Sequence, residues 1–261
     1  MKKVLILALI FFLFSPPATI RGGEIAFISK AYSFLKAMYV PEIGLLREYW
    51  GSKRCWLYND NYLAYKILSR QKEYLELTRN IERVFDNYKV SLEGNGRLEV
   101  LFDQIIEFPP KVGESFYLDY RDGFSIFTEN AKMSPLDWDE YGDLLLYGTI
   151  DESRKGNKDY QSLWIRAKDM FDGFGIRDRV AIATGKYETY KLALFLFTAN
   201  LLKDDSIDRE KIIGILSKLQ DEDGGFVTHY DKNSNWLGFS NVETTCFVIL
   251  ALESCNWNSL D

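Results

Sequence analysis

Two kinds of apolar segment alternate along the chain, and this alternation limits the possible folds more than any other feature. In residues 208–220, apolar side chains recur at helical spacing on one side while charged side chains face the other way. This pattern predicts an outer helix that covers a core with one face. The next apolar segment has no polar face between Cys246 and Leu252. A helix that is apolar all round must be buried all round, so this segment is predicted to be an inner helix.

The same pairing of an outer helix with an inner helix recurs upstream. The other pairs are residues 160–171 with 190–202, residues 25–39 with 61–68 and, more weakly, residues 74–88 with 138–150. Such a repeat is typical of two concentric helical layers. We therefore expect a mainly α fold, an α/α toroid, which is incomplete or open because only about eight helices are visible.

A different composition interrupts the helical pattern at about residues 90–130. Residues 90–102 alternate around Gly94, Asn95 and Gly96, which is a hairpin signal, and residues 113–127 continue with aromatic extended segments. We expect a small β-rich insertion that packs over one end of the ring. The insertion belongs to a single toroid domain that spans residues 24–261.

The stretch from Ile212 to Leu252 resembles the repeat of the terpenoid-cyclase and protein-prenyltransferase toroids. In that repeat an outer helix ends in a Gln, and a short acidic, glycine-rich turn with an aromatic residue follows. The residues at those spacings here are Leu216, Gln220, Gly224 and Phe226. The resemblance implies the toroid fold more firmly than an activity, because such folds host cyclases, transferases, sugar hydrolases, lyases and binding modules. The Asp-rich motif of the cyclases and the zinc-binding Asp, Cys and His of the prenyltransferases have no counterpart in this sequence.

The charge and the metal-binding residue types exclude several classes of partner. The 261 residues carry a net charge of −6 with scattered Lys and Arg, which argues against a nucleic-acid partner. One histidine and three separated cysteines do not make a zinc site, and we expect no metal and no cofactor. A calcium site at Asp172 and Asp178 is the alternative. Among the three cysteines, only Cys55 and Cys246 could form a disulfide with each other. Buried free thiols are the favoured prediction for both.

Residues 1–23 have the order of an export signal. Two lysines precede an apolar run from Val4 to Phe14, and Pro16 and Pro17 follow. The run is short for a membrane span. We therefore predict a secreted or cell-surface protein, which would touch the membrane only if this N-terminal segment stays uncleaved as an anchor. A plain N-terminal core helix is the alternative.

Acidic residues stand at the entries to three predicted inner helices, and in a toroid these entries converge on one mouth. We predict Asp60, Glu188 and Glu243 as catalytic carboxylates, together with His229, the only histidine, as a general base. The predicted substrate-binding residues are Trp56, Tyr190, Tyr230, Trp236, Asp172 and Asp178. Paired carboxylates and aromatic faces suit a glycan, because one acid can protonate a glycosidic oxygen while another activates water.

Each of these residues also has a purely structural interpretation. Ser240 and Glu243 are spaced as a capping box, Glu188 repeats that spacing after Gly185, and acidic side chains are favoured in any first helical turn. His229 could be an ordinary loop histidine that bonds a backbone carbonyl. The glycines that follow Gln220 are interpreted as a helix stop, with one residue in the left-handed conformation.

Three functions compete. The favoured hypothesis is an exported toroid that binds a carbohydrate and, if it is an enzyme, cleaves it as a glycoside hydrolase or polysaccharide lyase. The second is a non-catalytic surface module that binds a peptide or a protein partner. The third, prompted only by the resemblance, is an isoprenoid cyclase or transferase.

Overall fold

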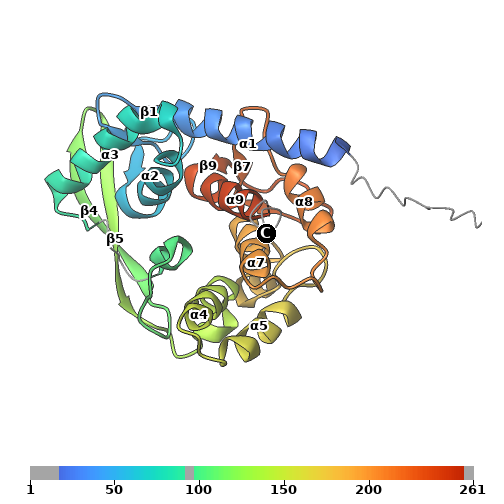
Figure 1. The fold of residues 1–261 in the computed structure, drawn as a ribbon. Coiled ribbons are helices and arrows are strands. Elements are labelled where there is room, and N and C mark those ends of the chain that lie inside the picture. Colours follow the sequence, from blue (N-terminus) through green and yellow to red (C-terminus); the bar gives the residue numbers. More distant parts are fainter. Residues whose placement is uncertain (1–17, 92–96, 256–261) are drawn as a thin grey trace, which may run out of the picture.

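The computed structural model describes residues 18–91 and 97–255, and its architecture is mixed α/β (Figure 1). About 51% of it is helix and 18% is strand, and the described residues form nine α-helices and four small sheets. The prediction of a mainly α, α/α-toroid fold is therefore wrong. A long β-hairpin lies in the wall of the molecule between α3 and α4, where a continuous ring would need helices (Figure 1).

Four helices form the interior of the molecule. They are α2 (Leu63–Leu68), α4 (Gly142–Arg154), α7 (Thr189–Leu201) and α9 (Val242–Ser254). α9 packs against both α2 and α7, and α7 also packs against α4. Both α7 and α9 are buried on nearly every face, as their apolar sequences predict.

The remaining helices cover this interior from outside. They are α1 (Ala18–Met38), α3 (Leu75–Tyr88), α5 (Tyr160–Asp169), the short α6 (Arg179–Thr184) and α8 (Arg209–Ser217). α1 packs on α9, α3 on α2, α5 on α4 and α8 on α7. In α8 only Ile212 and Leu216 are buried, which agrees with the one-sided apolar stripe in the sequence.

The largest sheet joins the middle of the chain to its N-terminal part. Its strands are β3 (Arg54–Trp56), β4 (Val112–Arg121) and β5 (Phe124–Met133), in the order β3-β5-β4. β4 and β5 form an antiparallel hairpin around Asp122 and Gly123, both with positive φ, and β3 runs parallel to β5. The β-rich insertion is thus real, but it is part of the molecular wall and not an addition to one end of a ring.

The hairpin predicted around Gly94–Gly96 is not seen. Residues 92–96 lie outside the described residues, and the expected second strand is instead the 3₁₀ helix η3 (Leu98–Phe102). Its Leu98, Val100 and Leu101 are buried. Spacings of one, two and three residues among these apolar side chains fit a tight helical turn, whose apolar side chains fill the centre of the molecule.

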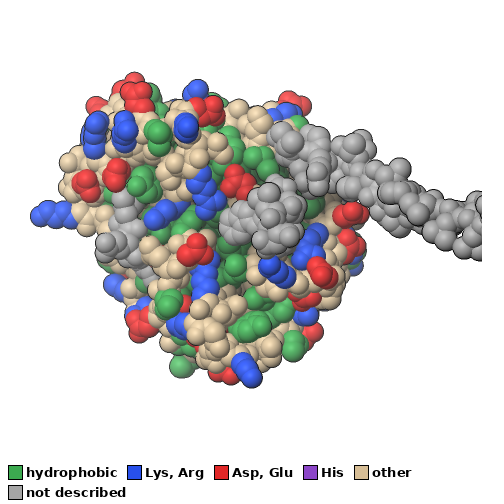
Figure 2. All heavy atoms as spheres, viewed as in Figure 1, with side chains coloured by type: hydrophobic (Ala, Val, Ile, Leu, Met, Phe, Trp, Pro, Cys, Tyr) green, Lys and Arg blue, Asp and Glu red, His purple; other side chains and the backbone are tan. Residues whose placement is uncertain are grey.

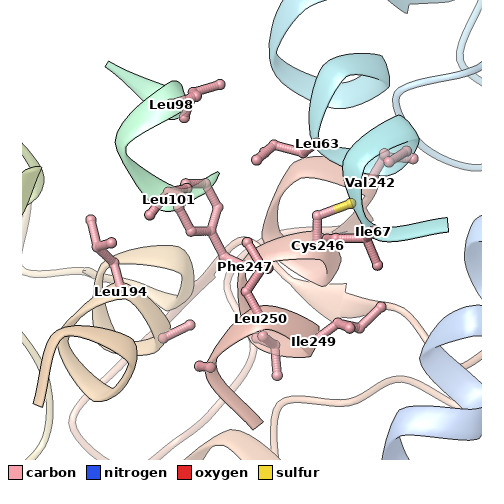
Figure 3. Close-up of a cluster of buried hydrophobic side chains, with 14 of the residues drawn as sticks. Leu63, Ile67, Leu98, Leu101, Leu194, Val242, Cys246, Phe247, Ile249 and Leu250 are labelled. Carbon is pink, nitrogen blue, oxygen red and sulfur yellow. The ribbon is translucent and has the colours of Figure 1, made fainter. Parts of the chain in front are cut away.

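Figure 3 shows how this centre is packed. Leu101 of η3 lies beside Phe247 of α9, with Leu63 of α2 and Leu194 of α7 around them. All four side chains are at most 3% exposed, and burial of each contributes roughly 1.5–3 kcal/mol. Cys246, in the same cluster, is a buried free thiol.

Three two-stranded sheets and a π-helix shape the loops that enter the inner helices. The sheets pair β1 (Tyr39–Val40) with β2 (Leu45–Leu46), β6 (Tyr187–Glu188) with β8 (His229–Tyr230), and β7 (Phe226–Val227) with β9 (Ser240–Asn241). The π-helix η1 (Leu57–Tyr62) leads directly into α2. Two short 3₁₀ helices, η2 (Lys72–Tyr74) and η4 (Trp138–Glu140), complete the described elements.

Most of the predicted export segment, residues 1–17, lies outside the described residues, and α1 begins at Ala18. None of the helices in the described part of the chain is long and apolar enough to span a bilayer. Figure 2 shows acidic and basic side chains interspersed over one face of the molecule, with apolar patches between them.

Candidate functional site

The three predicted carboxylates stand at the entries to three inner helices, and none of them caps its helix through a side-chain hydrogen bond. Asp60 lies in η1 before α2, Glu188 ends β6 before α7, and Glu243 lies in the first turn of α9. The cap of α9 is Asn241, whose side chain accepts a hydrogen bond from the Thr244 amide at 2.9 Å. The predicted capping hydrogen bonds of these acids are therefore not found, although Glu188 stands at the N-cap position of α7 and Glu243 in the first turn of α9.

Asp60 and Glu243 line one cavity of about 180 Å³, which we call the acidic cavity. Its lining residues are Glu48, Trp56, Asn59, Asp60, Glu129, Asn241 and Glu243. They come from four separate parts of the chain. Backbone pairing brings two of these parts together, because the Val242 amide donates to the Glu48 carbonyl at 3.0 Å and Tyr49 bridges Asn241.

The π-helix holds Asp60 in a buried position. The side chain of Asn61 anchors this turn: it accepts from the Leu46 amide at 2.7 Å and donates to the carbonyls of Leu46 at 3.1 Å and Trp56 at 2.7 Å. Asp60 itself is only 3% exposed, and its Oδ2 has no hydrogen-bond partner. π-Helical turns are frequent at functional sites, and a buried polar atom without a partner needs an explanation.

The carboxyl groups of Asp60 and Glu243 hold their protons unusually tightly. Burial raises the pKa of Asp60 well above its ordinary value, and the nearby Glu243, Glu48 and Glu129 raise it further. Burial raises the pKa of Glu243 to about 7, with Arg97 opposing the rise and Glu129, Asp143 and Glu188 adding to it. Arg97 favours ionisation of Glu243, whereas no cation acts in this way on the pKa of Asp60.

Arg97 is the cation that interacts with these acids: it pairs with Glu129 and favours ionisation of Glu243. Its Nη2 lies 3.1 Å from Oε2 of Glu129, whose Oε1 accepts a 2.8 Å hydrogen bond from the Asn59 amide group. Burial alone would lower the pKa of Arg97, but Tyr147, Glu129, Asp143 and Glu243 outweigh burial and raise it. Arg97 therefore stays charged, and its charge is largely matched by Glu129.

A second cavity of about 310 Å³, here called the lysine cavity, contains Glu188. The other residues that line it are Arg97, Val112, Pro135, Tyr141, Asp143, Leu144, Val180, Tyr190 and Lys191. Lys191 Nζ lies 2.5 Å from Glu188, 2.6 Å from Asp178 and 3.8 Å from Asp143. Burial lowers the pKa of Lys191, but these three carboxylates outweigh burial and raise it.

His229 lies beside Glu188, opposite it in the β6–β8 pair. Its Nδ1 is 2.9 Å from the Thr228 hydroxyl, so the expected bond to a backbone carbonyl is not the one that the structure shows. Burial lowers the pKa of His229, with Glu188 opposing this effect. The ring lines neither of the two cavities.

Comparison of the chain with family models, curated proteins and solved structures gives no match in any of the three. The terpenoid-cyclase resemblance of residues 212–252 therefore stays a prediction. Function has to be argued from the chemistry of the two cavities.

The predicted aromatic contacts are divided among different places. Trp56 lines the acidic cavity, where its ring stacks on Phe127 at 4.9 Å, and Tyr190 lines the lysine cavity. Tyr230 is 1% exposed and donates to the Phe174 carbonyl at 2.9 Å, so it belongs to the core. Trp236 is 44% exposed on a loop and lines neither cavity.

Asp172 and Asp178 have structural roles. Asp172 forms a turn by accepting from the amides of Phe174 and Gly175, and it also accepts from the Tyr187 hydroxyl at 2.6 Å. Asp178 caps α6 through the Ala181 amide at 3.0 Å and pairs with Lys191. No group of three acidic, His or Cys side chains within residues 18–91 and 97–255 could hold a metal ion, so the structure gives the calcium alternative no support.

The sequence prediction missed several residues of the site, namely Glu48, Asn59, Arg97, Glu129, Asn241 and Lys191. One signal was available for Lys191, because it is the only charged residue within α7. A charge in a fully buried helix needs a partner and therefore marks a polar site. Glu48 and Glu129 carry no such local signal, because they reach the cavity only through tertiary pairing.

Proposed function

We propose that the protein binds a glycan in the acidic cavity and hydrolyses a glycosidic bond there. The observation that carries this proposal is that Asp60 and Glu243 line one cavity, where burial raises the pKa of both and Arg97 favours ionisation of Glu243 alone. Two carboxyl groups with separated pKa values are the usual acid and base of glycoside hydrolysis.

In this mechanism Asp60 is the general acid and Glu243 the general base. Asp60 donates its proton to the glycosidic oxygen as the bond from that oxygen to the anomeric carbon breaks. Glu243, once ionised, takes a proton from water, whose oxygen forms the new bond to the anomeric carbon. The leaving sugar departs as an alcohol, and proton exchange with solvent restores both carboxyl groups.

The size and lining of the cavity support a sugar ring. About 180 Å³ is less than the usual volume of a site for a drug-sized ligand, so the cavity suits one ring of a longer chain. Trp56 offers an aromatic face, and the carboxyl and amide groups offer partners for hydroxyl groups.

The same lining argues against two other reactions. A lyase acts on a uronate polymer, whose carboxylates would be repelled by four acidic side chains with no Lys or Arg among the lining residues. An isoprenoid substrate needs an apolar, aromatic cavity, and this one is mostly polar. Hydrolysis of a glycan is therefore favoured over both.

The test is release of new reducing ends from a panel of neutral, acidic and amino polysaccharides. Asp60→Asn and Glu243→Gln should each lower kcat by about 100-fold or more, because general acid or base catalysis contributes that much. Glu210→Gln on the exposed side of α8 is the matched control and should keep wild-type activity.

Two outcomes would count against hydrolysis. Binding of a glycan without new reducing ends would leave the protein as a non-catalytic binding module, which is the second candidate. Cleavage that persists in both cavity variants would place the active site elsewhere.

A further inference from the structure

The acidic cavity offers more hydrogen-bond acceptors than donors, even with Asp60 and Glu243 protonated. Glu48, Asp60, Glu129 and Glu243 line it, and no Lys or Arg does. Among the amides, Asn59 already donates to Glu129, and its own Oδ1 is a buried acceptor without a partner. A ligand that fits this lining must bring donors of its own.

With Asp60 and Glu243 protonated, the cavity lining still carries the negative charge of Glu48. Arg97 neutralises Glu129, but Glu48 forms no ion pair with any described residue. Oδ2 of Asp60, on the same wall, is buried and has no hydrogen-bond partner. A neutral sugar would leave this charge uncompensated, whereas a cationic group would be attracted by it.

A metal ion does not fit this arrangement of acids. The described Asp, Glu, His and Cys side chains include no group of three that could hold one. The carboxyl groups are instead spread around the cavity wall, as contacts to different atoms of an organic ligand would require.

We infer that the glycan carries free amino groups, and that a 2-amino-2-deoxyhexose unit occupies the cavity with its ammonium group near Glu48. An ammonium group has three donors and no acceptor, which matches the lining. N-acetylation removes the charge and adds a carbonyl acceptor that would face other acceptors. This inference rests on the proposed function for the choice of a sugar ligand, but it is tested by binding alone.

The experiment compares two ligands that differ only in acetylation. Isothermal titration at pH 6 measures binding of a fully deacetylated glucosamine oligomer and of the N-acetylated oligomer of the same length. We expect the deacetylated oligomer to bind at least tenfold more tightly to the wild-type protein. Glu48→Gln should weaken its binding about tenfold, as for loss of one charged contact, and Glu210→Gln, with the same charge change on α8, should not.

Salt provides a second measurement. Raising the NaCl concentration should weaken binding of the deacetylated oligomer in the wild-type protein and less so in Glu48→Gln, because the ion pair is screened. Circular dichroism and the melting temperature verify that Glu48→Gln is folded.

The outcomes separate this inference from the proposed function. Equal or tighter binding of the acetylated oligomer overturns the inference, and hydrolysis of a neutral glycan can still stand. Binding of calcium chloride alone that Glu48→Gln abolishes also overturns it, by showing a metal site. If no glycan of any charge is bound or cleaved, both proposals fail.

Discussion

Lys191 is a buried cation within an otherwise apolar helix, and three carboxylates surround it. Its side chain is 3% exposed, and its ammonium group contacts Asp178, Glu188 and Asp143. Asp178 in turn accepts from the Gly142 amide at 2.9 Å, so this ion cluster links α7 to the starts of α4 and α6. One residue thus holds three helix entries in fixed positions.

Replacement of Lys191 by Met should destabilise the protein strongly. Met keeps the length of the side chain but leaves the fully buried Asp178 without its cation, which typically costs about 3–5 kcal/mol. Urea denaturation at pH 7 measures this loss. Lys186→Met, at an exposed position nearby, should change the free energy of unfolding by about 0.5 kcal/mol or less. Similar midpoints for the two variants would show that the ion cluster is not needed for stability.

The ionisation of Glu243 sets the expected pH dependence of activity. As general base it must be ionised, so kcat/KM should rise as the pH passes through about 7, and it should fall at higher pH as Asp60 loses its proton. Arg97 lowers the pKa of Glu243, so Arg97→Gln should move the rising limb upward by about one pH unit. Arg79→Gln, on the exposed face of α3, should leave it in place. A rising limb that Arg97→Gln does not move would argue against Glu243 as the base.

At the scale of elements, helical periodicity predicted the long helices and the short α2 but missed the other short helices. α5, α7, α8 and α9 were visible in the sequence because their apolar spacing repeats over several turns. The short α6, η1 and η3 do not repeat long enough to show a period, and tertiary contacts decide their form.

The acids of the site could be predicted, but not their neighbours. Asp60 lies just before α2, and Glu243 lies in the first turn of α9. This position at the start of an apolar helix made both residues predictable from the local sequence. Glu129 reaches the cavity because β5 pairs in parallel with β3, and Glu48 because its carbonyl binds the start of α9. Neither long-range pairing leaves a pattern in the local sequence. The overall fold was mispredicted for the same reason, because the β-sheet that forms part of the wall depends on the long-range pairing of β3 with β5.

The turn after α8 depends on a glycine that no other residue replaces easily. Gly224 has φ of +93°, and a Cβ atom there would lie 2.3 Å from the Lys30 carbonyl oxygen of α1. The predicted left-handed glycine is thus found, although it lies within the turn that follows Gln220 and not at the end of α8, which is Ser217. Gln220 fixes this turn by donating to the carbonyls of Phe27 and Gly224, both at 2.9 Å.

Alanine at two glycines should therefore have opposite effects. Gly224→Ala should lower the free energy of unfolding by about 2–4 kcal/mol, because it adds both backbone strain and a clash with α1. Gly214→Ala, inside α8 with nothing within 4 Å of its Cβ, should raise it by about 0.5–1 kcal/mol. Thermal unfolding of the two variants measures the difference. A neutral Gly224→Ala would mean that α1 can move away from the turn.

At the scale of the whole molecule, the acidic cavity makes stability depend on pH. The folded protein binds Glu243 and Asp60 protons more tightly than the unfolded chain does, so stability is lost as the pH rises through the folded pKa values. Other acids act in the opposite direction at low pH: hydrogen bonds from Ser206, Trp164 and Lys168 outweigh burial and lower the pKa of Asp204. His229, whose pKa burial lowers, also opposes the cavity below about pH 6.5, so variants of the cavity acids are needed to isolate their effect.

Between about pH 4.3, the ordinary value for Glu, and about pH 7, the folded value for Glu243, the free energy of unfolding should fall with a slope of up to about 1.4 kcal/mol per pH unit for each of the two carboxyl groups, Glu243 and Asp60. Glu243→Gln should remove the contribution of Glu243 to this slope, because its amide does not titrate. Asp60→Asn should likewise remove the contribution of Asp60, which begins above about pH 3.9, the ordinary value for Asp, and continues up to the folded pKa of this residue. Urea denaturation of the three proteins at pH 5, 6, 7 and 8 measures these slopes. A wild-type protein that becomes more stable from pH 5 to pH 7 would contradict the assignment of buried protons to this cavity, and with it the acid and base roles that depend on those protons.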